Sequence, residues 1–205
     1  MQGYILRVQK VKDEDCIVYI LTDELLVCCY RFYGARHSKI TLGYKLDFEL
    51  ENSINFLPSL KNTMHLGYSW LLDRDRLLYW QGFIRLFYNH LKDLEEVNKF
   101  YFEILDQSAI KIAKQNPKRV FLESYIQILK FEGRLHDEEI CFFCDKKIKS
   151  EKIALARAFL PAHEKCIGKN GFIKSKIYEY YKNISTINLN DEEVDKLYEI
   201  LNEGF

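Results

Sequence analysis

Four residues in the C-terminal third constrain the local fold of this chain most strongly: Cys141, Cys144, His163 and Cys166. They form two pairs, Cys-Phe-Phe-Cys and His-Glu-Lys-Cys, each with two residues between its members. This spacing places two donors on one tight turn, and two facing turns bring together the three thiolates and one imidazole that structural zinc selects. The pairs therefore predict a structural Zn²⁺ site with these four residues as ligands. The alternative is a reduced pair of core cysteines beside a surface His-Glu-Lys turn.

Length and composition indicate a globular protein of one large or two small domains. The chain has 205 residues, of which 48% are hydrophobic and 15% aromatic, enough to bury a substantial core. No apolar run reaches the roughly 18 residues of a transmembrane helix, and the N-terminal residues lack the pattern of a signal peptide. We therefore expect a cytoplasmic protein with no membrane partner. Three further cysteines lie in apolar sequence and are expected to be reduced core thiols, Cys16, Cys28 and Cys29.

The net charge of zero conceals an uneven distribution. Residues 31–45 carry four Lys or Arg and no acid, whereas residues 191–205 carry six acids and one base. Residues 110–135 and 143–182 are also basic. Basic runs are usually solvated faces, but three of them in a neutral protein favour an anionic partner such as nucleic acid.

Hydrophobic alternation predicts strands up to about residue 70. They are expected at residues 2–11, 16–21, 25–33, 40–51 and 63–68. In the fourth, one face carries Tyr44, Leu46, Phe48 and Leu50. Five short strands in so few residues suit a small barrel such as the OB type, whose exposed face commonly binds single-stranded nucleic acid.

From about residue 73 the hydrophobic period becomes helical. Apolar stripes predict helices at residues 77–91, 97–112, 121–129, 173–182 and 191–201. Gly133 is expected to end the third helix, and Asn190 or Asp191 to cap the last. The predicted fold class is α+β. An N-terminal five-stranded OB-type β-barrel, residues 1–72, is followed by an α-helical bundle, residues 73–205, with an inserted zinc-binding module at about 139–170.

Two stretches resemble the RecO family of bacterial recombination mediators. Residues 32–39, Phe-Tyr-Gly-Ala-Arg-His-Ser-Lys, are similar to the family's Gly-Ala-Arg-x-Ser-Lys turn in the barrel. Residues 129–135, Leu-Lys-Phe-Glu-Gly-Arg-Leu, resemble the Leu-x-x-x-Gly-x-x-Leu end of the helix before the family's first Cys-x-x-Cys. The chain departs from the family in being short, in having His163 where the second pair usually begins with Cys, and in having His37 where Lys or Arg is common.

The resemblance implies a non-enzymatic mediator of homologous-recombination repair that is cytoplasmic and associated with the bacterial nucleoid. Such proteins bind single- and double-stranded DNA, anneal complementary strands and engage the C-terminal tail of the single-strand binding protein SSB. Together with RecR they help load RecA onto SSB-coated strands. No small-molecule substrate is implied.

Candidate DNA contacts lie at the end of the third predicted strand and in the turn after it. Electrostatic contact with phosphates is expected from Arg31, Arg36, His37 and Lys39. Tyr33 is the candidate for base stacking, whereas Tyr30 and Phe32 are expected in the barrel core. A basic rim that binds the acidic SSB tail is expected from Lys111, Lys114, Lys118 or Arg119. A further DNA-facing patch is expected from Lys146, Lys147, Lys149 and Lys152.

An enzyme is the rival class, and the motifs argue against it. Zinc deaminases place His-x-Glu before Pro-Cys-x-x-Cys and keep an open metal position, whereas here the order is reversed and Glu164 directly follows His163. Phosphate loops, Gly-x-Ser-x-Gly and His-Glu-x-x-His are missing from the sequence, as is the His cluster of an HNH-type nuclease. The remaining alternative is a zinc-containing nucleic-acid-binding module of transcription or RNA metabolism.

Overall fold

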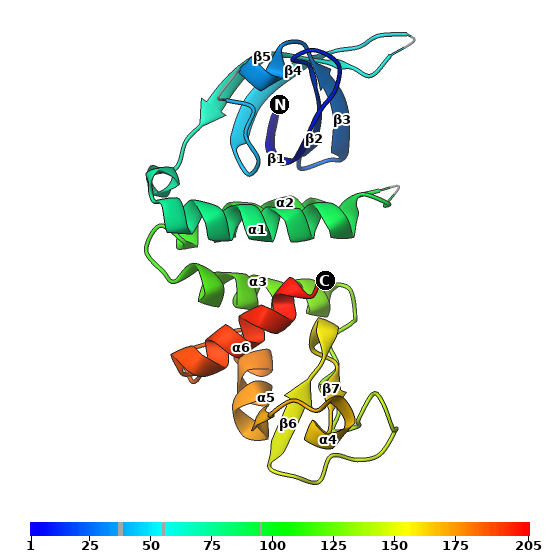
Figure 1. The fold of residues 1–205 in the computed structure, drawn as a ribbon, viewed down its shortest axis with the longest axis vertical. Helices are drawn as coiled ribbons and strands as arrows, with labels where there is room; N and C mark the ends of the chain where they lie inside the picture. Colours follow the sequence, from blue (N-terminus) through cyan, green and yellow to red (C-terminus); the bar gives the residue numbers. More distant parts are fainter. Residues whose placement is uncertain (37–38, 55, 95) are drawn as a thin grey trace. The chain divides into compact units, whose positions relative to one another are not determined.

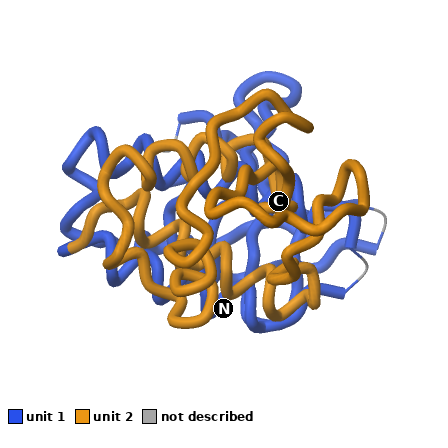
Figure 2. The backbone as a smooth tube through the Cα atoms, turned by 90° about the horizontal axis from the view of Figure 1, so that it is seen from below, with its two compact units in different colours: residues 1–114 blue, residues 115–205 orange. Residues whose placement is uncertain are grey.

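The computed structural model describes residues 1–36, 39–54, 56–94 and 96–205 (Figure 1). These residues form two compact units, Met1–Lys114 and Gln115–Phe205, which Figure 2 shows in blue and orange. The predicted boundary after residue 72 falls inside the first unit, at the step from barrel to helices.

Unit 1 begins with a closed five-stranded barrel, which confirms the predicted OB-type fold. Its strands are β1 (Gln2–Lys10), β2 (Cys16–Leu21), β3 (Leu26–Arg31), β4 (Lys45–Glu51) and β5 (Ser59–Leu66). The order around the barrel is β1-β2-β3-β5-β4, and β1 closes it by pairing with β4. Strands β3 and β5 run parallel and pair at Tyr30 and Ser59.

Alternation along β4 places the predicted face in the barrel core. Leu46 and Phe48 are buried there, and Tyr44 and Leu50 pack against the same core. Cys16 and Cys29 are also buried, as expected of core thiols, whereas Cys28 is half-buried.

Several predicted strand ends are wrong, and each has a local cause. The strand predicted from residue 40 begins at Lys45, because residues 40–44 form a turn in which Gly43 has a φ of 83°. The strand predicted at residues 25–33 ends at Arg31, before Tyr33 adopts a φ of 53°. The strand predicted at residues 63–68 is Ser59–Leu66. Its start was not predicted because the exposed polar residues Lys61 and Asn62 interrupt the hydrophobic alternation.

Two helices pack on the barrel within unit 1, α1 (Arg74–Leu91) and α2 (Lys99–Lys111). Short 3₁₀ turns precede them, η1 (Gly34–Arg36) and η2 (Ser69–Leu72). The indole of Trp80 in α1 donates to the Gly43 carbonyl at 2.7 Å. The Tyr4 hydroxyl in β1 donates to the carboxylate of Asp106 in α2 at 2.6 Å. A buried hydrogen bond from α1 and a partly buried one to α2 therefore fix both helices against the barrel.

Unit 2 is built on three helices, α3 (Pro117–Phe131), α5 (Lys174–Asn183) and α6 (Asp191–Asn202). Gly133, with a φ of 66°, lies just beyond the end of α3, as predicted. Asn190 is the N-cap of α6, where its side chain accepts from the Glu193 amide and the Glu193 carboxylate accepts from the Asn190 amide. This reciprocal pair is a capping box.

A small module lies between α3 and α5 in the chain. It contains a three-stranded sheet in the order β7-β6-β8, made of β6 (Lys152–Leu155), β7 (Pro161–Ala162) and β8 (Phe172–Ile173). A 3₁₀ turn η3 (Arg157–Phe159) links β6 to β7, and the short helix α4 (Glu164–Ile167) follows β7. Within the described residues, no helix has both the length and the apolar character needed to cross a membrane.

Candidate metal centre and nucleic-acid interface

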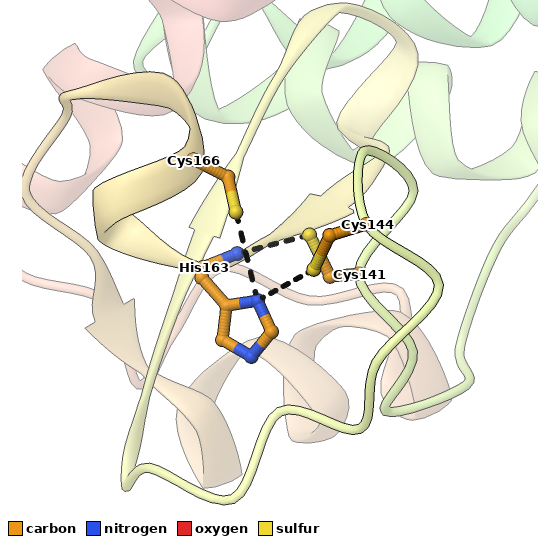
Figure 3. Close-up of side chains that lie close together, drawn as sticks. All are labelled: Cys141, Cys144, His163 and Cys166. Carbon is orange, nitrogen blue, oxygen red and sulfur yellow. Dashed lines mark hydrogen bonds between the residues drawn. The ribbon is translucent and has the colours of Figure 1, made fainter.

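The four residues predicted as metal ligands come together in the small module (Figure 3). One donor atom from each of Cys141, Cys144, His163 and Cys166 lies within 4.8 Å of the other three. The first two residues come from the turn after residue 140, His163 is the N-cap of α4, and Cys166 lies in α4. The cluster can hold a metal ion.

Backbone hydrogen bonds shape both turns and connect them. The Cys141 amide donates to the Lys146 carbonyl at 3.0 Å, which closes the first turn. The Cys166 amide donates to the His163 carbonyl at 2.9 Å in the second. The Phe142 amide donates to the Pro161 carbonyl at 2.8 Å and so ties the two turns together. These backbone bonds therefore hold the two turns, and the residues that carry the donor atoms, close together.

The imidazole of His163 presents one nitrogen to the cluster. Its Nδ1 lies 3.4 Å from Cys144 Sγ and 3.8 Å from Cys166 Sγ. Its Nε2 lies 3.4 Å from the backbone carbonyl of Lys147. A metal-binding histidine commonly donates its second ring N–H to such a carbonyl, which leaves the first nitrogen as the ligand. The orientation of His163 fits this arrangement.

Local hydrogen bonds and neighbouring thiols change the acidity of the cysteines in opposite directions. Burial opposes ionisation of Cys141, but hydrogen bonds from the amides of His163, Phe143 and Cys144 and from the Cys144 thiol lower its pKa to about 6. Desolvation, together with the hydrogen bonds and charges of Cys141 and Cys144, raises the pKa of Cys166 to about 11. A bound cation would offset the repulsion between these thiolates, so three sulfurs and one imidazole nitrogen fit a divalent metal.

Of the residues predicted to touch DNA, Arg31 ends β3 and Arg36 ends the 3₁₀ turn η1, and the charge of both is already engaged. Arg31 donates from Nη1 to the Leu60 carbonyl at 2.6 Å. Arg36 pairs with Glu14 and lies over the Tyr33 ring, 5.7 Å from its centroid. Tyr33 and Lys39 are exposed, whereas His37 lies outside the described residues. A DNA contact by these five residues stays a prediction.

The expectation that Phe32 belongs to the barrel core is wrong. Its side chain is 53% exposed and packs edge-on against Tyr30, with ring centroids 4.9 Å apart. Together with Phe56, Leu57 and Ile17, the two rings line a cavity of about 570 Å³. Phe56 is 82% exposed. The sequence signal for this surface is the mostly apolar run Ile-Asn-Phe-Leu at residues 54–57, in an otherwise polar loop. The sequence prediction did not use this signal.

Two bases of the predicted rim are bound to neighbouring elements of unit 2. Lys118 donates to the Asp195 carboxylate at 2.7 Å. Arg119 donates to the carbonyls of Thr186 and Leu189 and pairs with Asp191 at 2.8 Å. These contacts attach α3 to α6 and to the loop before it.

Comparison with known proteins identifies the barrel. Residues 1–71 match the family model described as RecO N terminal. No curated protein matches the chain. The chain is therefore RecO-like through its N-terminal domain, and the resemblance inferred from its motifs is confirmed there.

Proposed function

We propose that this RecO-like chain is a recombination mediator of DNA repair. In this role it binds single- and double-stranded DNA, anneals complementary strands and engages the SSB tail, and with RecR it helps load RecA. The observation that carries the proposal is the match of residues 1–71 to the RecO N-terminal family, on a closed barrel with the predicted fold.

Annealing requires no catalytic group, and we propose that the chain is not an enzyme. Two DNA strands repel each other through their phosphates, so a protein that neutralises this charge and holds both strands close accelerates pairing. The proposed phosphate contacts on the barrel are Arg31, Arg36, His37 and Lys39. The proposed base contact is Tyr33. The exposed rings of Phe32 and Phe56 extend this surface with stacking area.

The metal centre is proposed to hold Zn²⁺ in a structural role. Three thiolates and an imidazole are a donor set that Zn²⁺ selects, and four protein ligands close a tetrahedral site. The residues present would hold the ion by Sγ of Cys141, Cys144 and Cys166 and by Nδ1 of His163. When bound, the ion would supply cross-linking of the two turns and no reaction chemistry.

The metal assignment predicts that Cys144→Ser abolishes metal binding. We expect purified wild type to carry about one zinc per chain and the variant almost none, because a hydroxyl is a poor zinc ligand. Cys28→Ser is the matched control, since Cys28 is a half-buried thiol of the barrel. Mass spectrometry of the metal content decides the result. A Cys144→Ser protein with full zinc would disprove the ligand set.

Strand annealing tests the function. Two complementary oligonucleotides, each coated with the SSB of the same bacterium, are mixed with and without this protein in the absence of ATP. Acceleration that is lost when the acidic SSB tail is deleted is the expected result. If folded, zinc-loaded protein gives no acceleration, the mediator proposal fails. DNA or RNA binding without annealing would then favour the zinc-containing nucleic-acid-binding module of transcription or RNA metabolism.

A further inference from the structure

A second basic surface lies in unit 1, in the groove between β1 and α1. Its lining includes Arg7 and Val8 of β1, Leu42 of the following turn, and Arg85 and Asn89 of α1, around a cavity of about 370 Å³. Neither Arg7 nor Arg85 belongs to the basic segments that the sequence singled out. The side chains of Arg7, Arg85 and Asn89 are exposed.

Both arginines of this groove lack an acidic partner in the part of the chain that the structure describes. Among the described residues, no carboxylate forms an ion pair with Arg7 or Arg85, in contrast to Arg36, which pairs with Glu14. The surrounding sequence explains this. Residues 2–10, 39–44 and 74–91 together carry six Lys or Arg and a single acid, Asp75, in the first turn of α1.

The groove is held in a fixed geometry. Arg7 lies over the ring of Tyr88, 4.9 Å from its centroid, which orients the guanidinium. Trp80 and Gln81 of α1 donate to the carbonyls of Gly43 and Leu42 at 2.7 Å and 3.3 Å. The Gly43 amide in turn donates to Ile5 of β1 at 2.8 Å. Both walls are thus attached to the turn between them.

We propose that this groove binds the phosphodiester backbone of nucleic acid, with Arg7 and Arg85 on the phosphates and the Asn89 amide as a further donor. Guanidinium groups match phosphate oxygens in a bidentate manner and are weakly hydrated. The apolar side chains of Val8 and Leu42 between them suit the sugar edge of a strand. The inference rests on the proposed DNA-binding function and adds a contact surface to it.

The test is binding of a fluorescein-labelled single-stranded oligonucleotide to the full chain, followed by anisotropy at several salt concentrations. The double variant Arg7→Gln/Arg85→Gln is expected to bind about tenfold more weakly at low salt. The slope of log K against log salt should fall by about 1.4, since each single-strand phosphate contact contributes about 0.7. Arg85→Gln alone should give about half of that change in slope.

A matched control removes two positive charges elsewhere. Lys99 and Lys196 are exposed on helices. Lys99 pairs with Glu103 four residues later, and Lys196 pairs with Glu192 four residues earlier. Lys99→Gln/Lys196→Gln should therefore bind with nearly the wild-type slope. Equal thermal unfolding midpoints of wild type and Arg85→Gln establish that a lost contact, and not misfolding, causes the change.

The outcomes separate the two proposals. If wild type binds and Arg7→Gln/Arg85→Gln binds equally tightly with the same slope, the groove assignment is wrong and the proposed function stands. If wild type fails to bind DNA, both fall. If polyglutamate of equal length competes as well as unlabelled oligonucleotide, the groove selects acidic protein segments and the phosphodiester assignment is overturned.

Discussion

At the scale of single residues, Gly43 shows how one position joins the barrel to a helix. Its φ is 83°, and a Cβ added there would lie 2.7 Å from Cδ1 and Nε1 of Trp80. The same turn accepts the Trp80 indole hydrogen bond. A side chain at this position would therefore combine backbone strain with displacement of a buried ring.

Gly43→Ala is predicted to lower the free energy of unfolding of unit 1 by about 2–4 kcal/mol. The measurement is urea unfolding followed by tryptophan fluorescence. Gly133→Ala is the control, because Gly133 also has a positive φ of 66° but no atom within 4 Å of the added Cβ. It should cost only about 1 kcal/mol, measured by circular dichroism. Equal losses in the two variants would show that the contact with Trp80 is unimportant.

At the scale of elements, the N-terminus of α6 is stabilised by a side-chain cap and by acids in its first turn. Asn190 accepts from the Glu193 amide at 2.8 Å, and three acids occupy the first turn, where the helix dipole favours them. The apolar side of this helix is buried through Val194, Leu197 and Leu201. The cap thus fixes where a core-forming helix begins.

Asn190→Ala is predicted to destabilise unit 2 by about 1 kcal/mol, because it leaves the Glu193 amide of the first turn without its side-chain acceptor. Asn202→Ala at the exposed end of the same helix is the matched control and should change stability by less than about 0.5 kcal/mol. Thermal melting followed by far-ultraviolet circular dichroism reports both. A larger loss for Asn202→Ala would contradict the capping assignment.

At the scale of the whole molecule, the two units carry different reporters. Both tryptophans, Trp70 and Trp80, lie in unit 1, whereas the four Cys and His residues that can hold a metal ion lie in unit 2. Chelation of the zinc ion that we propose there is predicted to lower the midpoint of the circular dichroism melt and leave the tryptophan fluorescence transition in place. A matching shift of both transitions would instead mean that the units unfold together.

Alkaline pH should also weaken the fold, because burial raises the pKa of several tyrosines. It raises that of Tyr125 to about 12 and those of Tyr180 and Tyr181 well above the ordinary value. The folded state therefore keeps protons that the unfolded chain releases above about pH 10. Stability from these groups is complete below pH 10 and is predicted to fall as pH rises toward 12. Urea midpoints measured from pH 9 to pH 12 test this, and constant midpoints would contradict it.

The sequence by itself determined the features that depend on spacing and period. The four cluster residues follow from two short-range turns, β2 from a six-residue apolar run with polar residues on both sides, and the helices from apolar stripes. Each of these signals is local, because the physical cause lies within one turn or one strand of the residues concerned. The same is true of Asn190, one of the two caps predicted.

Only the tertiary structure decided which side chains are free to act. In the sequence, Arg31 and Arg36 have no obvious partner. In the structure, Arg31 donates to the Leu60 carbonyl, 29 positions away, and Arg36 forms an ion pair with Glu14, 22 positions away. The packing of α1 against β1 brings Arg7 and Arg85 to one groove, where neither has a carboxylate partner among the described residues. The β4–β5 loop places Phe56 near Phe32. Contacts between distant segments depend on strand order and helix packing, which hydrophobic period does not encode.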